Sequence, residues 1–139
     1  MKLDLTAMEK AVAQLEKSLW YLESDAAKND RGLYEQFRAA AIQGFEYTYE
    51  LCIKIIRRQL AGIVANPGEL REIEFMDLIR TAYEAGIVSN PAAFKMYREM
   101  RNITSHTYDE NKAEDVIKIT GSFLEEVKSI IERIKKRNQ

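Results

Sequence analysis

The stretch Leu33–Gly62, "LYEQFRAAAIQGFEYTYELCIKIIRRQLAG", decides the fold of this chain. Its apolar residues return every three or four positions, which is the period of an α-helix with one buried face. We therefore expect a single long helix over residues 32–62. Gly44 in its middle costs about 1 kcal/mol relative to alanine, and such a glycine often lets another element pack closely. The apolar stripe consists of Phe37, Ala41, Phe45, Tyr49, Cys52 and Ile56.

Four more stretches have the same period and extend the helical prediction over most of the chain. Helices are expected over residues 5–22, over 75–85, from about 91 into the segment 102–110, and over 113–136. No stretch shows the alternation of a half-buried strand. Because most connections are short, these helices predict an all-α fold. We expect an antiparallel four-helix bundle with an additional short helix, in one domain over residues 1–139.

The ends of the first two helices are predicted from capping and helix-breaking residues. Thr6 followed by Glu9 is a plausible capping box for the first helix. The segment 24–32, "SDAAKNDRG", is interpreted as a connection to the long helix. The segment 65–69, "ANPGE", contains a proline and a glycine, both strong helix breakers, and closes the region of the long helix.

The shorter helices have predicted ends of the same kind. Gly86 is expected to stop the helix over residues 75–85. Ser89 or Asn90 could cap the helix that follows, with Pro91 in its first turn, where the missing N–H costs nothing. The weak helix formers after residue 102 indicate fraying or a local distortion where that helix ends.

The composition excludes several classes of protein. A formal net charge of −1 over 139 residues argues against a general nucleic-acid coat, but it leaves room for a local site acting on RNA. The single cysteine, Cys52, excludes an internal disulfide and a cysteine-based zinc site within one chain, and we expect it to be buried. The N-terminal stretch lacks the apolar core of a signal peptide, and no apolar run approaches the ~20 residues of a membrane span. We expect a cytoplasmic protein without membrane contact.

The segment Arg101–Glu110, "RNITSHTYDE", contains the only histidine, His106. One histidine cannot form a two-histidine zinc site, and the chain has no glycine-rich phosphate loop, so no metal or other cofactor is predicted. His106 can transfer a proton near neutral pH, and Arg101 can bind a phosphate through its fork of donors. Together they suit cleavage of RNA without a metal. The histidine would assist attack by a 2′-hydroxyl, and the arginine would stabilise the charge that develops at phosphorus.

The spacing of these residues is awkward for one straight helix. Arg101 and His106 are five residues apart, which would place them about 140° apart and about 7.5 Å along the axis. Asn102, four residues before His106, is its natural neighbour and could orient the imidazole. Tyr108 returns to nearly the same face as Arg101. Either the helix end is distorted, or two copies of the chain form the site across a two-fold axis, each supplying an Arg and a His.

With these residues the chain resembles the HEPN superfamily and, within it, the HepT-like proteins, the nucleotidyltransferase substrate-binding proteins. The resemblance rests on the motif Arg, four residues, His, one residue, Tyr, which is complete as Arg101, His106 and Tyr108. The polar residue that often follows the arginine is present as Asn102. The segment 38–54, "RAAAIQGFEYTYELCIK", and the helix order also fit, so the resemblance covers nearly the whole chain.

The resemblance implies an activity, a partner and a form of regulation. HepT-like proteins are helical bundles that dimerise, and the motifs of two protomers form a metal-independent ribonuclease site at the dimer cleft. The chain would then be the toxin of a type VII toxin–antitoxin pair. Its partner would be a minimal nucleotidyltransferase antitoxin that silences it by transferring AMP to Tyr108. Two alternatives remain, a noncatalytic substrate-binding subunit of a two-component nucleotidyltransferase and a purely structural interaction module.

The long helix also carries polar residues whose role the sequence leaves open. Gln43, Glu46 and Glu50 share a face, because they lie about one turn apart. They could line the cleft of the ribonuclease site or contact the nucleotide of a partner. They could equally form a solvated stripe beside the core.

The remaining residues of the long helix have simpler interpretations. Tyr47 and Tyr49 are expected to be packing residues. Arg57 and Arg58 are expected to form a solvated face. The sequence predicts no particular role for Arg38.

Overall fold

The protein is built from helices. The computed structural model describes residues 3–71 and 73–139, and no strand occurs among them. In chain order the elements are α1 (Thr6–Leu22), α2 (Asp25–Asn29), α3 (Arg31–Ala61), the 3₁₀ helix η1 (Pro67–Arg71), α4 (Phe75–Glu84), α5 (Ala93–Ile103), the 3₁₀ helix η2 (Thr104–His106) and α6 (Glu110–Arg137).

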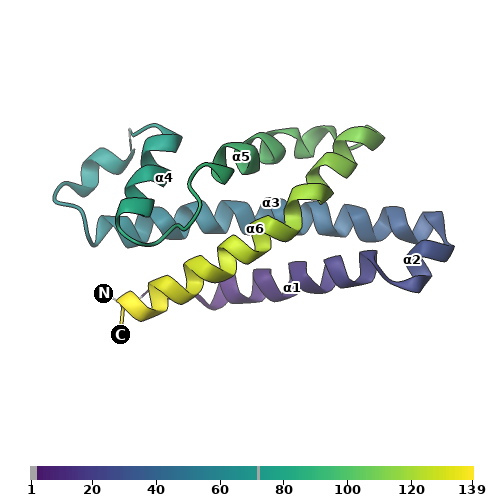
Figure 1. Cartoon of the computed structure of the whole chain (residues 1–139), viewed down its shortest axis with the longest axis horizontal. Coiled ribbons are helices and arrows are strands. Elements are labelled where there is room, and N and C mark those ends of the chain that lie inside the picture. The colour runs from purple at the N-terminus through teal and green to yellow at the C-terminus, as the bar shows by residue number, and fades with distance from the viewer. Residues whose placement is uncertain (1–2, 72) are drawn as a thin grey trace.

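The predicted all-α fold is confirmed, and its four main helices are α1, α3, α5 and α6. Each runs antiparallel to the one before it, and α6 lies across the other three (Figure 1). Helix α4 is the predicted additional short helix, and it packs against α3 and α5. The two chain ends lie together at one end of the bundle, and the α5–α6 connection lies toward the other (Figure 1). Within the described residues, none of the helices has the length and apolar character that a membrane span requires.

Aromatic side chains from three helices join the centre of the core. Phe45 of α3 and Phe123 of α6 meet edge to face with ring centroids 4.9 Å apart, and Tyr97 of α5 lies 5.2 Å from Phe123. Such pairs add about 0.5–1.5 kcal/mol beyond the burial of their area. The bulkiest fully buried side chains are Phe45, Phe94, Phe123, Met8, Leu15, Ile56, Leu60, Leu78, Ile79, Ile87, Ile130 and Ile134.

The glycine in the middle of α3 marks a close contact between α3 and α1. A Cβ atom at Gly44 would lie 3.2 Å from Cδ1 of Leu15, a side chain that is fully buried. The prediction that Gly44 permits close packing is therefore confirmed. The first helix accordingly packs along α3 over much of its length.

The predicted capping box of the first helix is wrong. Leu5, not Thr6, is the N-cap of α1, and an apolar side chain makes no capping hydrogen bond. The N–H of Thr6 instead donates to Oδ1 of Asp4 at 2.9 Å. The carboxylate of Asp4, just before the helix, therefore accepts from a first-turn N–H that has no partner within the helix.

The segment 24–32 is more than a connection, because it contains the short helix α2. The hydroxyl of Ser24 caps α2 by accepting from the N–H of Ala27, and the carboxylate of Asp30 caps α3 by accepting from the N–H of Leu33. Two capping residues so close together leave only one helical turn between them. A helix of that length is too short for its period to be recognised in the sequence.

The end of α4 agrees with the prediction, and the start of α5 does not. Gly86 follows α4 with a positive φ of 79°, which glycine tolerates best. Helix α5 begins only after Ala92, so neither Ser89 nor Asn90 caps it. The N–H and hydroxyl of Ser89 instead donate to the carboxylate of Glu126 at 2.9 and 2.5 Å. A tertiary partner on α6 has replaced the local one.

Candidate functional site

The segment that carries the predicted site is a distorted helix end. Helix α5 stops at Ile103, and the chain continues through the 3₁₀ turn η2 before Asp109 caps α6. The Asp109 carboxylate accepts from the N–H groups of Asn111 and Lys112 at 2.9 and 3.1 Å. Because the helix tightens at this point, the separation expected for one straight helix no longer applies. Of the two explanations for the spacing of Arg101 and His106, the distorted helix end is therefore present.

Two carboxylates of α3 hold the side chain of Arg101. Its Nη2 pairs with Glu50, and its Nε donates to Oε1 of Glu50 at 3.2 Å. Its Nη1 lies 3.6 Å from Oε2 of Glu46. The hydroxyl of Thr104 accepts from Nη1 at 3.3 Å, and it lies 2.6 Å from the same Glu46 oxygen, to which it donates. We call Arg101, Glu46, Glu50 and Thr104 the arginine clamp.

The arginine clamp changes the electrostatics of the site. The hydrogen bonds that Arg101 donates to Glu50, together with the charges of both glutamates, raise the pKa of Arg101, although partial burial acts against this. The positive charge of Arg101 is fixed in any case, and it is balanced locally by two negative charges. A phosphate that approaches Arg101 must therefore compete with these carboxylates. Exposed pairs of this kind are worth only about 0–1 kcal/mol each, so such competition is feasible.

His106 and Tyr108 lie at the surface beyond the clamp. Both are exposed, and Tyr108 keeps 86% of its accessible surface. Their rings lie edge to face with centroids 6.1 Å apart. Among the described residues no hydrogen bond joins His106 to Arg101 or to Asn102, which is also exposed. The structure therefore brings His106 next to Tyr108, and it brings neither Asn102 nor Arg101 to the imidazole within one chain.

A second cluster anchors the start of α6, immediately after the motif. Arg38 is 7% exposed, and its guanidinium donates to Glu110 at 2.6 and 2.9 Å and to Glu114 at 2.7 Å. The hydroxyl of Tyr34 donates to Glu114 at 2.7 Å, and Arg31 pairs with Glu110. Arg38, which had no predicted role, thus fixes the helix that follows His106 and Tyr108.

The carboxylates of this cluster titrate at lower pH than usual. The hydrogen bond from Arg38 lowers the pKa of Glu110, and the charge of Arg31 adds to the effect. Burial favours the neutral form of Glu114, but hydrogen bonds from Arg38 and Tyr34 outweigh it and lower its pKa as well. Both carboxylates are therefore ionised in the folded protein near neutral pH.

The other predictions for α3 have mixed outcomes. Glu46 and Glu50 form the arginine clamp, and Gln43 is exposed on the same helix. Tyr49 is buried as predicted, but Tyr47 is 54% exposed, so its expected packing role within one chain is wrong. Residues two positions apart lie about 200° apart around a helix, so Tyr47 faces away from the apolar stripe that contains Tyr49.

Two further predictions concern Cys52 and the arginine pair. Cys52 is fully buried as expected, and burial raises the pKa of its thiol well above its ordinary value. Arg58 is exposed, as predicted. Arg57 is only half-exposed, because its Nη1 donates to the carbonyl of Leu70 at 2.6 Å, so its predicted solvated role is wrong. Leu70 belongs to η1, and the spacing of apolar residues on α3 gives no sign of this hydrogen bond.

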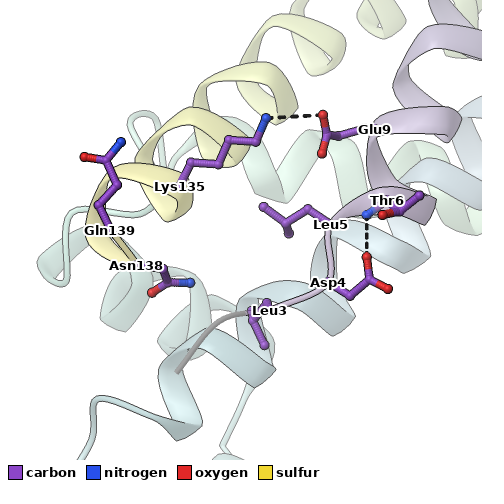
Figure 2. A pocket seen from close by; sticks show the side chains of 8 residues that line it. All are labelled: Leu3, Asp4, Leu5, Thr6, Glu9, Lys135, Asn138 and Gln139. Atoms are coloured by element: carbon purple, nitrogen blue, oxygen red, sulfur yellow. Dashed lines mark hydrogen bonds and ion pairs between the residues drawn. The ribbon is translucent and has the colours of Figure 1, made fainter.

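A polar cavity at the opposite end of the bundle contains none of the predicted site residues. Figure 2 shows it between the start of α1 and the end of α6, where Lys135 pairs with Glu9 at 3.2 Å. Its volume is about 420 Å³. The cavity lies beside the chain ends, and the α5–α6 connection lies toward the other end (Figure 1). We therefore keep the candidate site at the arginine clamp and the motif.

A family model described as "Nucleotidyltransferase substrate binding protein like" matches residues 3–136. The chain belongs to this nucleotidyltransferase substrate-binding family. It is also 35% identical over 133 residues to a protein of Haemophilus influenzae (strain ATCC 51907 / DSM 11121 / KW20 / Rd) named "Probable ribonuclease HepT". That match covers 96% of this chain and 88% of the relative. The resemblance found in the sequence is therefore confirmed.

A solved structure supports the fold of this family member. The Haemophilus influenzae protein HI0074, described as revealing the fold of a substrate binding domain of a nucleotidyltransferase, superimposes with a TM-score of 0.90 at 31% identity. The match covers 95% of this chain and 99% of the other. The matched family region contains the whole arginine clamp and the segment of His106 and Tyr108.

Proposed function

We propose that the protein is a metal-independent endoribonuclease, the toxin of a type VII toxin–antitoxin pair, whose site forms across a homodimer. The observation that carries this proposal is the exposed His106 beside Tyr108, on a connection whose arginine is already held in place by α3. A relative named as a probable ribonuclease supports it. A scaffold would have no need of the complete Arg–His–Tyr set.

The proposed reaction needs one arginine and a proton carrier on each side of the phosphate. One His106 takes the proton of the 2′-hydroxyl as that oxygen attacks the adjacent phosphorus. The bond from phosphorus to the 5′-oxygen breaks, and the second protomer's imidazolium gives that oxygen a proton. The products are a 2′,3′-cyclic phosphate and a free 5′-hydroxyl. Arg101 stabilises the negative charge that develops on the phosphoryl oxygens.

The proposed off-switch is AMP transfer to Tyr108 by a minimal nucleotidyltransferase partner. The phenol oxygen attacks the α-phosphorus of ATP, a phosphodiester to AMP forms, and pyrophosphate leaves. The exposure of Tyr108 supports this role, because a transferase must reach the hydroxyl. Its ring lies against His106, so the added phosphate and adenosine would stand in the path of RNA.

Replacement of the histidine tests the catalytic proposal. We expect His106→Ala to lower the rate of RNA cleavage by at least about 100-fold, because general acid–base catalysis contributes about 10²–10⁴-fold. The assay follows a labelled single-stranded RNA in the presence of EDTA. Ser105→Ala, at the exposed neighbouring position, is the matched control and should cleave like the wild type. Equal rates for wild type and His106→Ala would refute the catalytic role.

Replacement of the tyrosine tests the regulatory proposal. Incubation with the partner transferase and ATP should add the mass of adenylate to the wild type and abolish its cleavage of RNA. Tyr108→Phe should cleave RNA, gain no mass and stay active, because it lacks the attacking oxygen. Mass spectrometry after proteolysis reads the modified residue directly. Adenylate on Tyr47, the other exposed tyrosine of this region, would contradict the assignment to Tyr108.

The second candidate function is a noncatalytic substrate-binding subunit of a two-component nucleotidyltransferase. The family description and the account of the HI0074 structure favour it. In that case the wild type would show no cleavage that depends on His106, and the transferase would act on a third molecule only when this chain is present. The two assays above therefore separate the two functions.

A further inference from the structure

A second group of cationic side chains lies in a cavity formed by α3, α5 and the residues that lead into α4. Helices α4 and α5 lie on the same side of α3 (Figure 1). The cavity has a volume of about 490 Å³. It is lined by Arg57, Ile73, Glu74, Phe75, Met76 and Arg98.

This cavity and the arginine clamp each include an arginine of α5. Arg98 precedes Arg101 by three residues on α5, which places the two about 4.5 Å apart along the axis and on neighbouring faces. Burial raises the pKa of Tyr49 to about 12, and the charges of Arg98 and Arg101 both act against this rise. The rings of Tyr49 and Phe75 stack with their centroids 6.4 Å apart. The guanidinium carbon of Arg98 lies over the Phe75 ring, 4.7 Å from its centroid.

The charges in the cavity differ from those in the clamp. Within the described part of the chain, neither Arg57 nor Arg98 pairs with a carboxylate, whereas Arg101 pairs with two. Arg57 is steadied by its hydrogen bond to the Leu70 carbonyl, and Arg98 by the face of Phe75. Among the described residues of the lining, Glu74 is the one acidic side chain beside two arginines.

We propose that this cavity binds a backbone phosphate of single-stranded RNA next to the phosphate that is cleaved. Arg98 and Arg57 are its ligands, and Phe75 forms its floor. The inference rests on the proposed ribonuclease function, which it deepens by adding a substrate subsite. The donor forks of two arginines that pair with no carboxylate among the described residues suit a phosphate, and the line from Arg101 to Arg98 suits a chain of phosphates better than a single small anion.

Binding of an oligonucleotide that cannot be cleaved tests the subsite. We would use a labelled, mixed-sequence 2′-O-methyl oligoribonucleotide, which lacks the attacking hydroxyl, and the full-length protein. Arg98→Gln and Arg57→Gln should each weaken binding about tenfold. Each should also lower the salt slope of the affinity by about 0.7, the value for one phosphate contact in a single strand. Glu74→Gln should tighten binding about 2-fold, because it removes the opposing charge.

The matched control is Arg58→Gln, an exposed arginine next to Arg57 that does not line this cavity. It should leave affinity and salt slope unchanged, and circular dichroism should show every variant folded. If Arg98→Gln and Arg57→Gln bind like the wild type while the wild type cleaves RNA, the subsite is wrong and the ribonuclease stands. If the wild type neither binds the oligonucleotide nor cleaves RNA, both proposals fail. A loss of AMP transfer with unchanged oligonucleotide binding would assign the cavity to the partner and overturn the subsite.

Discussion

At the scale of single residues, the main question is why an arginine proposed to bind phosphate is held by carboxylates. Arg101 has two negative neighbours, Glu46 and Glu50, and all three side chains are partly exposed to solvent. A clamp of this kind fixes the position of a long, flexible side chain before substrate arrives. It also offsets the charge that would attract the substrate. In the proposed ribonuclease, the clamp would therefore position Arg101 and also lower its affinity for phosphate.

Glu50→Gln should separate these two effects. The variant removes one negative charge beside Arg101 but keeps a polar side chain of the same size. We expect the affinity for uncleavable RNA to rise about 2- to 5-fold, in line with the small worth of an exposed ion pair. Fluorescence anisotropy at low and high salt measures the change. Glu99→Gln, which removes a charge from an exposed site on α5, is the control and should have no effect. Weaker binding by Glu50→Gln would instead mean that positioning outweighs charge.

The sequence predicted the motif residues but not the partners that organise them. Arg101, His106 and Tyr108 are recognisable because their chemistry and spacing are local. Glu50 lies 51 residues before Arg101, and no pattern on α5 points to it. Thr104 is one of the weak helix formers after residue 102, and its position three residues after Arg101 places it on an adjacent face.

At the scale of elements, the cluster around Arg38 fixes the start of α6 and hence the connection that carries the motif. Arg38 is nearly buried, whereas its partners Glu110 and Glu114 are partly exposed. A buried cation without a partner is costly, so the cluster depends on both carboxylates being ionised. The anchoring of α6 should therefore depend on pH.

Stability measurements at several pH values test this anchoring. The folded-state pKa values of Glu110 and Glu114 lie below their ordinary value of 4.5. Their contribution is therefore present above about pH 4.5 and is lost as the pH falls through the lowered values. Arg38→Met should cost about 1–3 kcal/mol at pH 7 in urea unfolding and should flatten the loss of stability below pH 4.5. Arg80→Met, which removes an exposed pair with Asp77, is the control. The same acid sensitivity in Arg38→Met and wild type would contradict the role of the cluster.

The positions of the main helices could be predicted from the sequence, and most of their N-terminal capping residues could not. The periods of α1, α3 and α6 follow from the burial of one face, which requires apolar residues at fixed spacing. Several neighbouring polar residues can each cap a helix start, and a hydrogen bond to a distant residue can take a side chain away from the capping position. Ser89 shows this, because it donates to Glu126, which is 37 residues away. The short helix α2 was missed because one turn has no recognisable period.

At the scale of the whole molecule, one chain has a single imidazole, but the proposed reaction needs a base and an acid. Within one chain, His106 is exposed and has no hydrogen bond to Arg101 in the described part. A second copy related by a two-fold axis would supply the missing imidazole and a second arginine at the same phosphate. Tyr47, which is exposed on α3, would then be a candidate for burial between the copies.

Mixing wild-type and inactive subunits tests whether two copies share one site. If each site needs both copies of His106, a dimer with one His106→Ala subunit is inactive, and only wild-type pairs cleave RNA. After equal amounts are mixed and allowed to exchange, about a quarter of the dimers are then active, and activity falls to about half that of the wild-type protein present. If each subunit had its own complete site, the activity per wild-type subunit would not change. Native mass spectrometry of a size-tagged variant confirms the exchange, and an unmutated tagged chain is the control. Activity that stays proportional to the wild-type protein would contradict the shared site, because every His106 would then work without its counterpart.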